Sequence, residues 1–168
     1  MKLLTVFSSM FLILTVFLNV GCDSAAFIAG HANTFNSPGY LPVRVRVCPL
    51  TEYKLFPNSD RSPRIRIFLN LYDAFGSQIK SPGVFRFELY EYVQRSADPK
   101  GRRINIWPDI DLKNADKNNE YWRDFLRAYE FDLDFEPQTP AQSYVLQATC
   151  FCPNGKRLLA EYTLKPAD

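Results

Sequence analysis

Apolar and polar residues alternate along three segments in the first half of the chain. Segment 43–47 reads Val-Arg-Val-Arg-Val, segment 64–71 reads Arg-Ile-Arg-Ile-Phe-Leu-Asn-Leu, and segment 85–90 reads Phe-Arg-Phe-Glu-Leu-Tyr. A period of two places the apolar side chains on one face of a strand, so each segment predicts a half-buried β-strand. Residues 73–83 contain two glycines and a proline, and we expect them to form the turn of a hairpin between the last two of these strands.

The same alternation returns in the second half of the chain. Ile104 and Ile106 indicate a shorter strand, which Pro108 ends or restricts to a sheet edge because proline cannot donate to a strand ladder. Segment 130–136 reads Glu-Phe-Asp-Leu-Asp-Phe-Glu and predicts a strand with its acids on one face and its apolar groups on the other. Segments 143–151 and 157–164 form a final pair, since the Asn-Gly at 154–155 is a strong hairpin signal.

One stretch has helical spacing instead. Between residues 115 and 129, apolar residues recur at positions 121, 122, 125, 126 and 129. This spacing predicts one α-helix near 116–128, with Asp116 as its N-cap. A lone helix of this length needs tertiary packing to persist, so its apolar stripe is expected to lie over an open end or edge of the sheets.

About seven strands with a single helix predict a mostly β protein. The arrangement resembles an immunoglobulin-like β-sandwich, with a C2-like sandwich or a small barrel as the alternatives. Hydrophobic residues make up 46% of the sequence and aromatic residues 15%, enough to order a core. We therefore expect residues 41–168 to form a single domain.

The first 22 residues have the pattern of an export signal. Lys2 provides a positive start, no charged residue occurs from Leu3 to Val20, and the segment ends in Val20-Gly21-Cys22. With this junction the chain resembles a bacterial lipoprotein precursor, although Asn19 stands where that family commonly has an aliphatic residue. The resemblance implies cleavage before Cys22 and a diacylglycerol on the Cys22 sulfur, with palmitate-type acyl chains.

This resemblance divides the chain into a signal peptide at 1–21, a lipidated flexible tether at 22–40 and the β domain. It implies a membrane partner through Cys22 and a place in the bacterial cell envelope, with the domain outside the cytoplasm. If flexible, a tether of about eighteen residues has a reach of roughly 25 Å. Two other interpretations stay open: an uncleaved membrane helix formed by the uncharged run, and an ordinary secretory cut after the Ser-Ala-Ala at 24–26.

Charge and motifs narrow the classes of function. Lys and Arg number 20 against 18 Asp and Glu, so the net charge is +2, and no strong field for a nucleic-acid partner follows. The one histidine, His31, lies in the tether, whereas catalytic groups need fixed geometry. Nucleotide-binding, hydrolase and zinc-protease motifs are absent from the sequence. We therefore expect a protein that is not an enzyme and has no cofactor.

The acidic residues give no convincing metal site. Asp109, Asp111 and Glu120 match three positions of a calcium-binding loop, but Lys113 stands where an oxygen ligand belongs and Asn114 where a glycine belongs. The acids of segment 130–136 are spread along one strand and cannot converge on one ion without a partner strand. We expect them instead to neighbour an arginine face, either that of segment 43–47 or that of segment 64–71.

Aromatic residues offer a weaker signal for a ligand. Tyr90 and Tyr92 share a strand face with Arg86 and Glu88, a mixture that suits a sugar or peptide and equally suits the outer face of a sheet. Trp107 and Trp122 are expected to pack in the core or against the helix.

Three cysteines remain after Cys22. In an exported protein disulfides persist, and Cys48 is predicted to bond with Cys150 or Cys152, because the last two project from one strand face and suit each other poorly. The alternative is three unbonded thiols packed as small apolar groups. A metal site is not expected, because a closed zinc site normally has four protein ligands.

Three functions remain, in order of support. The first is a lipid-anchored, non-enzymatic structural or interaction module of the cell envelope. The second is a carbohydrate- or peptide-binding domain of the envelope, with an envelope protein or glycan as partner. The third is an enzyme that uses carboxylates alone, such as a glycosidase, which needs two acids in a cleft.

Overall fold

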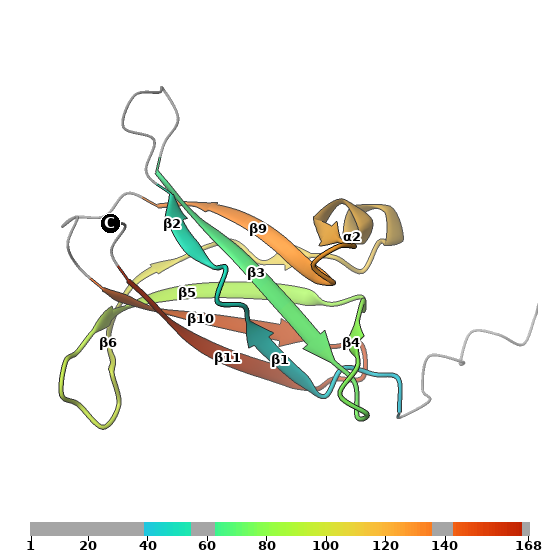
Figure 1. The fold of residues 1–168 in the computed structure, drawn as a ribbon, viewed down its shortest axis with the longest axis horizontal. Coiled ribbons are helices and arrows are strands. Elements are labelled where there is room, and N and C mark those ends of the chain that lie inside the picture. Colours follow the sequence, from blue (N-terminus) through green and yellow to red (C-terminus); the bar gives the residue numbers. More distant parts are fainter. Residues whose placement is uncertain (1–38, 55–62, 136–142, 166–168) are drawn as a thin grey trace, which may run out of the picture. The chain divides into compact units, whose positions relative to one another are not determined.

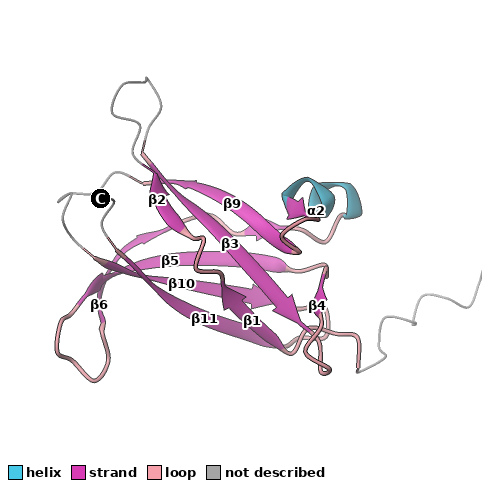
Figure 2. Cartoon of the chain, in the orientation of Figure 1, coloured by secondary structure: helices cyan, strands magenta, loops and turns pink. Residues whose placement is uncertain are grey.

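A computed structural model describes residues 39–54, 63–135 and 143–165, all within one compact unit of residues 36–168. The described residues form eleven β-strands and one short helix (Figure 1, Figure 2). All strand pairs are antiparallel, and they build two sheets. The prediction of a mostly β protein is confirmed.

Sheet A has the strand order β1-β3-β9-β8, with two short strands, β2 and β4, also paired to β3. Its strands are β1 (Arg44–Val47), β2 (Glu52–Lys54), β3 (Arg64–Tyr72), β4 (Gln78–Ile79), β8 (Trp122–Arg123) and β9 (Ala128–Asp134). Sheet B has the order β11-β10-β5-β6, with β7 also paired to β5. Its strands are β5 (Val84–Tyr92), β6 (Lys100–Ile106), β7 (Ile110–Asp111), β10 (Tyr144–Phe151) and β11 (Arg157–Leu164).

Each of the seven strands predicted from alternation is present among these. The apolar positions of the longest ones are fully buried, including four successive alternate residues of β3 and three of β5: Ile65, Ile67, Leu69, Leu71, Phe85, Phe87 and Leu89. β6 lies at the edge of sheet B, as Pro108 predicts. The turn between β10 and β11 contains Gly155 with a φ of +78°, a conformation that glycine adopts without strain.

The core lies between the two sheets. Phe131 of β9 in sheet A lies 5.3 Å from Phe85 and 4.8 Å from Phe87 of β5 in sheet B, measured between ring centroids. The rings are tilted relative to each other, an arrangement that aromatic pairs prefer. The structure is therefore a two-layer β arrangement held by aromatic packing between the layers.

The predicted hairpin between β3 and β5 is wrong. β3 belongs to sheet A and β5 to sheet B. After β3, the Asp73 carboxylate accepts hydrogen bonds from the backbone N–H groups of Phe75 and Ser77, at 2.9 and 2.8 Å, and the chain returns along β3 as β4. The tight turn thus joins β3 to the short strand β4, and the chain then crosses from sheet A to β5 in sheet B.

The predicted helix at 116–128 is too long. Helix α2 spans only Ala115–Tyr121, and its N-cap is Asn114 rather than Asp116: the Asn114 side chain accepts a hydrogen bond from the Lys117 N–H at 3.0 Å. The next two residues after the helix, Trp122 and Arg123, form β8, which pairs with β9. Phe125 of the expected apolar stripe is 84% exposed.

Packing of Trp122 and Tyr129 explains why the helix ends early. The two rings contact edge to face at 5.1 Å, and Trp122 lies opposite Tyr129 in the β8–β9 pair. Arg127 holds the turn between the strands in a left-handed conformation, with a φ of +49°, and its carbonyl accepts a hydrogen bond from the Asn70 side chain at 2.9 Å. These long-range contacts override the helical spacing.

The described residues contain no helix that is both long enough and apolar enough to cross a membrane. Several sequence predictions fall outside the described residues and stay predictions: the signal peptide at 1–21, lipidation of Cys22, and the tether up to residue 38, which contains His31. Glu136 also lies outside the described residues.

Candidate functional site

The acidic face of β9 lies beside the arginine face of β3. Asp132 is opposite Arg66 and Asp134 is opposite Arg64 in the strand register. Arg66 donates two hydrogen bonds to Asp132, from Nε at 2.8 Å and from Nη2 at 2.9 Å. The prediction of an arginine partner is confirmed, and the partner strand is β3 rather than β1. The hydrogen bond from Arg66 lowers the pKa of the Asp132 carboxyl, so Asp132 stays ionised at neutral pH.

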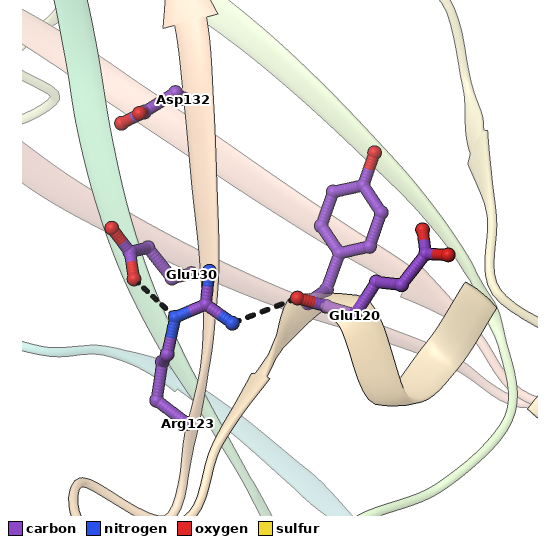
Figure 3. A pocket seen from close by; sticks show the side chains of 5 residues that line it. Glu120, Arg123, Glu130 and Asp132 are labelled. Carbon is purple, nitrogen blue, oxygen red and sulfur yellow. Dashed lines mark hydrogen bonds and ion pairs between the residues drawn. The ribbon is translucent and has the colours of Figure 1, made fainter. Parts of the chain in front are cut away.

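A hollow of about 330 Å³ lies next to the acidic face of β9, where this strand meets α2 and β8. Its lining is polar and charged: Glu120, Tyr121, Arg123, Glu130 and Asp132. Figure 3 shows the Arg123 guanidinium between the Glu130 carboxylate and the backbone of Glu120. Arg123 Nε lies 2.5 Å from Glu130 Oε2, and Arg123 Nη1 donates to the Glu120 carbonyl at 2.7 Å.

The chemistry of this hollow follows from its charge pairing. Glu130 contacts Arg123 and also Arg66, whose Nε lies 3.2 Å from Glu130 Oε1, so its carboxylate is neutralised from two sides. Within residues 39–54, 63–135 and 143–165, no three His, Cys, Asp or Glu side chains are grouped so as to hold a metal ion. A general acid of a glycosidase needs a raised carboxyl pKa, whereas the pKa of Asp132 is lowered. Two of the acids that line the hollow, Glu130 and Asp132, are thus partners of arginines in ion pairs.

The outer face of sheet B carries a second polar cluster, which sequence reasoning identified only in part. Glu88 accepts hydrogen bonds from Arg103 at 2.9 Å and from the Gln147 amide at 2.8 Å. The Lys100 ammonium in turn donates to the side-chain oxygen of Gln147 at 2.8 Å and to the Glu161 carboxylate at 2.5 Å. Four strands, β5, β6, β10 and β11, therefore contribute to one network.

Tyr90 borders this network. Its hydroxyl donates to Glu88 at 3.2 Å, and the Lys100 ammonium lies 5.2 Å from the centre of its ring. Burial and the neighbouring Glu88 carboxylate raise the pKa of Tyr90, so the hydroxyl remains a donor at neutral pH. The predicted grouping of Glu88 and Tyr90 on one face is confirmed.

A buried hydroxyl lies farther along the same face. The Thr149 side chain is 1% exposed, and its Oγ1 has no hydrogen-bond partner among the described residues. Thr149 lies opposite Arg86 of β5 in the register, and the Arg86 guanidinium lies 5.1 Å from the ring centre of Phe151. A buried polar group without a partner is uncommon and calls for an explanation.

The residues that mimic a calcium loop are dispersed. Asp109 receives two hydrogen bonds from Arg86, each 2.8 Å long, which lower the pKa of its carboxyl. Asp111 accepts from the Lys113 backbone at 2.9 Å instead. Both acids therefore have local structural partners.

Both tryptophans have packing roles, as the sequence predicts. Trp107 contacts Phe135 edge to face at 6.3 Å and donates its indole N–H to the Asp134 carbonyl at 2.9 Å. Trp122 packs on Tyr129. Neither indole is arranged with other aromatic rings as a flat ligand platform.

Cys48, Cys150 and Cys152 are free thiols in this structure. Cys48 donates to the Asn70 side chain, while the sulfurs of Cys150 and Cys152 lie 3.9 Å apart. The contact with Cys152 and burial raise the pKa of the Cys150 thiol, which keeps it protonated and unreactive. The bond predicted between Cys48 and one of the later cysteines is not formed in this structure, and it stays a prediction.

Lys100 and Gln147 were missed by sequence reasoning. Gln147 lies within a strand whose neighbours are mostly apolar, and Lys100 lies in a segment of weak alternation. Their contact depends on the pairing of β10 with β5 and with β11. The first pairing places Gln147 opposite Glu88, and the second places it opposite Glu161. A signal that could have marked them is the polar position inside an otherwise apolar strand.

Comparisons of this chain with protein-family models, with curated proteins and with solved structures found no match.

Proposed function

We propose that this protein is a lipid-anchored component of a bacterial cell envelope that acts as a non-enzymatic structural or interaction module. The observation that carries the proposal is the Val20-Gly21-Cys22 junction after an uncharged run that begins behind Lys2. Lipid on Cys22 would hold the β domain outside the cytoplasm, on a tether that ends at residue 40. We further propose that the two sheets form an immunoglobulin-like sandwich, a fold class that commonly serves binding.

The charge pairing of the described acids supports a non-enzymatic role. Asp109 and Asp132 each accept two hydrogen bonds from one arginine, and the pKa of each carboxyl is lowered as a result. Acid catalysis by carboxylates requires a group that remains protonated near neutral pH. A carboxylate-based enzyme is accordingly the weakest of the three candidate functions.

Replacement of the lipidated cysteine tests the proposal. With Cys22→Ala, the precursor should stay uncleaved and take up no labelled palmitate, because the sulfur that would carry the lipid is gone. Cys48→Ala is the matched control, since it removes a thiol within the domain and should be processed and labelled like the wild type. The mass of the mature N-terminus gives the second readout. Normal processing of Cys22→Ala, with a wild-type protein that partitions into water, would refute the proposal.

The outer face of sheet B favours a second function, the binding of an envelope glycan or peptide. The supporting observation is the Phe151 ring, whose centre lies 5.1 Å from the Arg86 guanidinium and 5.8 Å from that of Arg157. The exposed Arg157 and the Phe151 ring offer a donor and an apolar surface, the two features that sugar and peptide ligands use.

Titration with soluble cell-wall glycan fragments, followed by NMR amide shifts, tests this second function. Shifts confined to the neighbouring parts of β5, β10 and β11 are expected, and Phe151→Ser should abolish them. Phe125→Ser, at an exposed position in the turn between β8 and β9 of sheet A, is the matched control. Absence of shifts at saturating fragment, or shifts elsewhere, would remove this candidate.

A further inference from the structure

Two aromatic side chains are exposed where the described domain begins. Tyr40 is 73% exposed and Phe75 is 77% exposed, and their ring centroids lie 6.4 Å apart. Phe75 lies in the turn between β3 and β4, where its backbone N–H is bonded to the Asp73 carboxylate. The turn is thus locally ordered and exposes the Phe75 ring to water, which is unfavourable for an apolar side chain.

Two arginines lie at the same corner of the domain. Arg44 and Arg46 are exposed side chains of β1, and their guanidinium carbons lie 4.7 and 5.8 Å from the ring centre of Tyr72. The N–H of Val43 donates to the Tyr72 carbonyl at 2.8 Å, which joins the start of β1 to the end of β3. In the part of the chain that the structure describes, neither arginine forms an ion pair with an acid.

Tyr40, Phe75, Arg44 and Arg46 together form an aromatic-basic patch. Aromatic rings favour the boundary between lipid headgroups and acyl chains, and arginines are attracted to anionic lipid surfaces. A folded domain that carries both groups around the end of β3, with no described carboxylate pairing the arginines, has the chemistry of a surface that rests on anionic lipid.

We propose that this patch contacts the headgroups of the same membrane in which the Cys22 lipid is inserted. The inference rests on the proposed function, because it requires the anchor. Sixteen residues, 23–38, lie between Cys22 and the first described residue, Gly39. A segment of that length spans at most about 55 Å even when fully extended, so the anchor keeps the patch at a high local concentration near the membrane. A weak contact is then sufficient to orient the domain.

The opposite end of the domain provides the internal comparison. Figure 1 shows the connection between β5 and β6 at the left end, whereas the turn between β3 and β4 lies at the right. Val93, at the start of the β5–β6 connection, is 43% exposed. If the patch faces the membrane, position 75 touches lipid and position 93 does not.

Photocrosslinking in reconstituted vesicles tests the proposal on the full mature lipoprotein. A benzophenone amino acid replaces either Phe75 or Val93, and vesicles contain phosphatidylglycerol with phosphatidylethanolamine, or phosphatidylcholine alone. Lipid adducts are expected at position 75 and at background level at position 93. The double change R44Q/R46Q should reduce the adduct at position 75 toward that background in anionic vesicles, and neutral vesicles should give the same loss. Circular dichroism of each variant confirms that the domain is folded.

Vesicle flotation separates the two ways in which the proposal fails. Flotation with a lipid adduct at position 75 supports both the anchor and the patch. Flotation with equal adduct yields at positions 75 and 93 leaves the anchor standing and overturns the patch, as do protein–protein adducts at position 75, which would assign the surface to a second copy of the chain. Failure of the mature protein to float overturns the anchor and the patch together.

Discussion

The hydroxyl of Tyr129 offers the most direct test of how the two layers and α2 are joined. Tyr129 is fully buried in β9. Its oxygen accepts a hydrogen bond from the Ser81 N–H at 2.9 Å and donates to the Ser81 carbonyl at 2.8 Å. Asn118 of α2 has its Oδ1 3.0 Å from the same hydroxyl. One oxygen therefore links sheet A, the segment that crosses to sheet B, and the helix.

Tyr129→Phe removes this oxygen and keeps the ring. The Ser81 carbonyl still receives the Asn118 amide at 3.1 Å, but the buried Ser81 N–H loses the hydroxyl that accepts its hydrogen bond. An unsatisfied buried donor costs about 1–3 kcal/mol. We expect a loss of roughly 2 kcal/mol in the free energy of unfolding, which corresponds to an increase of up to about 30-fold in the unfolding equilibrium constant.

Urea unfolding of residues 23–168, followed by fluorescence and circular dichroism, measures the difference. Tyr162→Phe is the matched control, because the Tyr162 hydroxyl makes one exposed, 3.3 Å contact with the Pro49 carbonyl. That control should lie within about 0.5 kcal/mol of the wild type. Equal stability of Tyr129→Phe and Tyr162→Phe would refute the role given to the Tyr129 hydroxyl.

The pH dependence of the same pair of proteins provides an independent check. Burial raises the pKa of Tyr129 to about 12, from about 10 in the unfolded chain. Because the folded pKa is the higher one, the contribution of Tyr129 is complete below pH 10 and is lost as the pH rises through 12, by up to about 2–3 kcal/mol. The stability difference between the wild type and Tyr129→Phe should therefore shrink across this window. A constant difference would contradict the burial of an ionisable hydroxyl.

Three further predictions concern charge, thiols and the end of the helix. A double-mutant cycle of Arg66→Gln and Asp132→Asn should give a coupling of about 0.2–1 kcal/mol that falls with added salt, and a coupling of zero would deny the pair any role in stability. Thiol titration of the unfolded, unreduced mature protein should find three reactive thiols if the arrangement of Cys48 described here persists, whereas a count of one would establish a disulfide. Phe125→Ser should change stability by less than about 0.5 kcal/mol because the ring is exposed, and a loss of several kcal/mol would instead indicate the longer helix.

Local pattern was sufficient for the seven strands of four or more residues and for their faces, but it did not predict the short strands β2, β4, β7 and β8. In β3 and β9, side chains alternate between core and solvent, so the sequence alone separates Ile65 and Phe131 from Arg66 and Asp132. The Asn-Gly turn between β10 and β11 is equally local, since its shape depends on residues that are adjacent in the chain. The charge complementarity of β3 and β9 was predictable for a similar reason, because each strand carries charges of one sign on its polar face.

Partner choice was decided by tertiary structure. Alternation states which face of a strand is apolar but carries no information on which strand lies beside it, so the crossing between β3 and β5 was mistaken for a hairpin. The end of α2 depends on Trp122 meeting Tyr129, and the Glu88 network depends on β10 lying between β5 and β11. Each of these contacts joins residues brought together only by long-range pairing and packing, and the free energy of such pairing overrides weak local preferences for helix or turn.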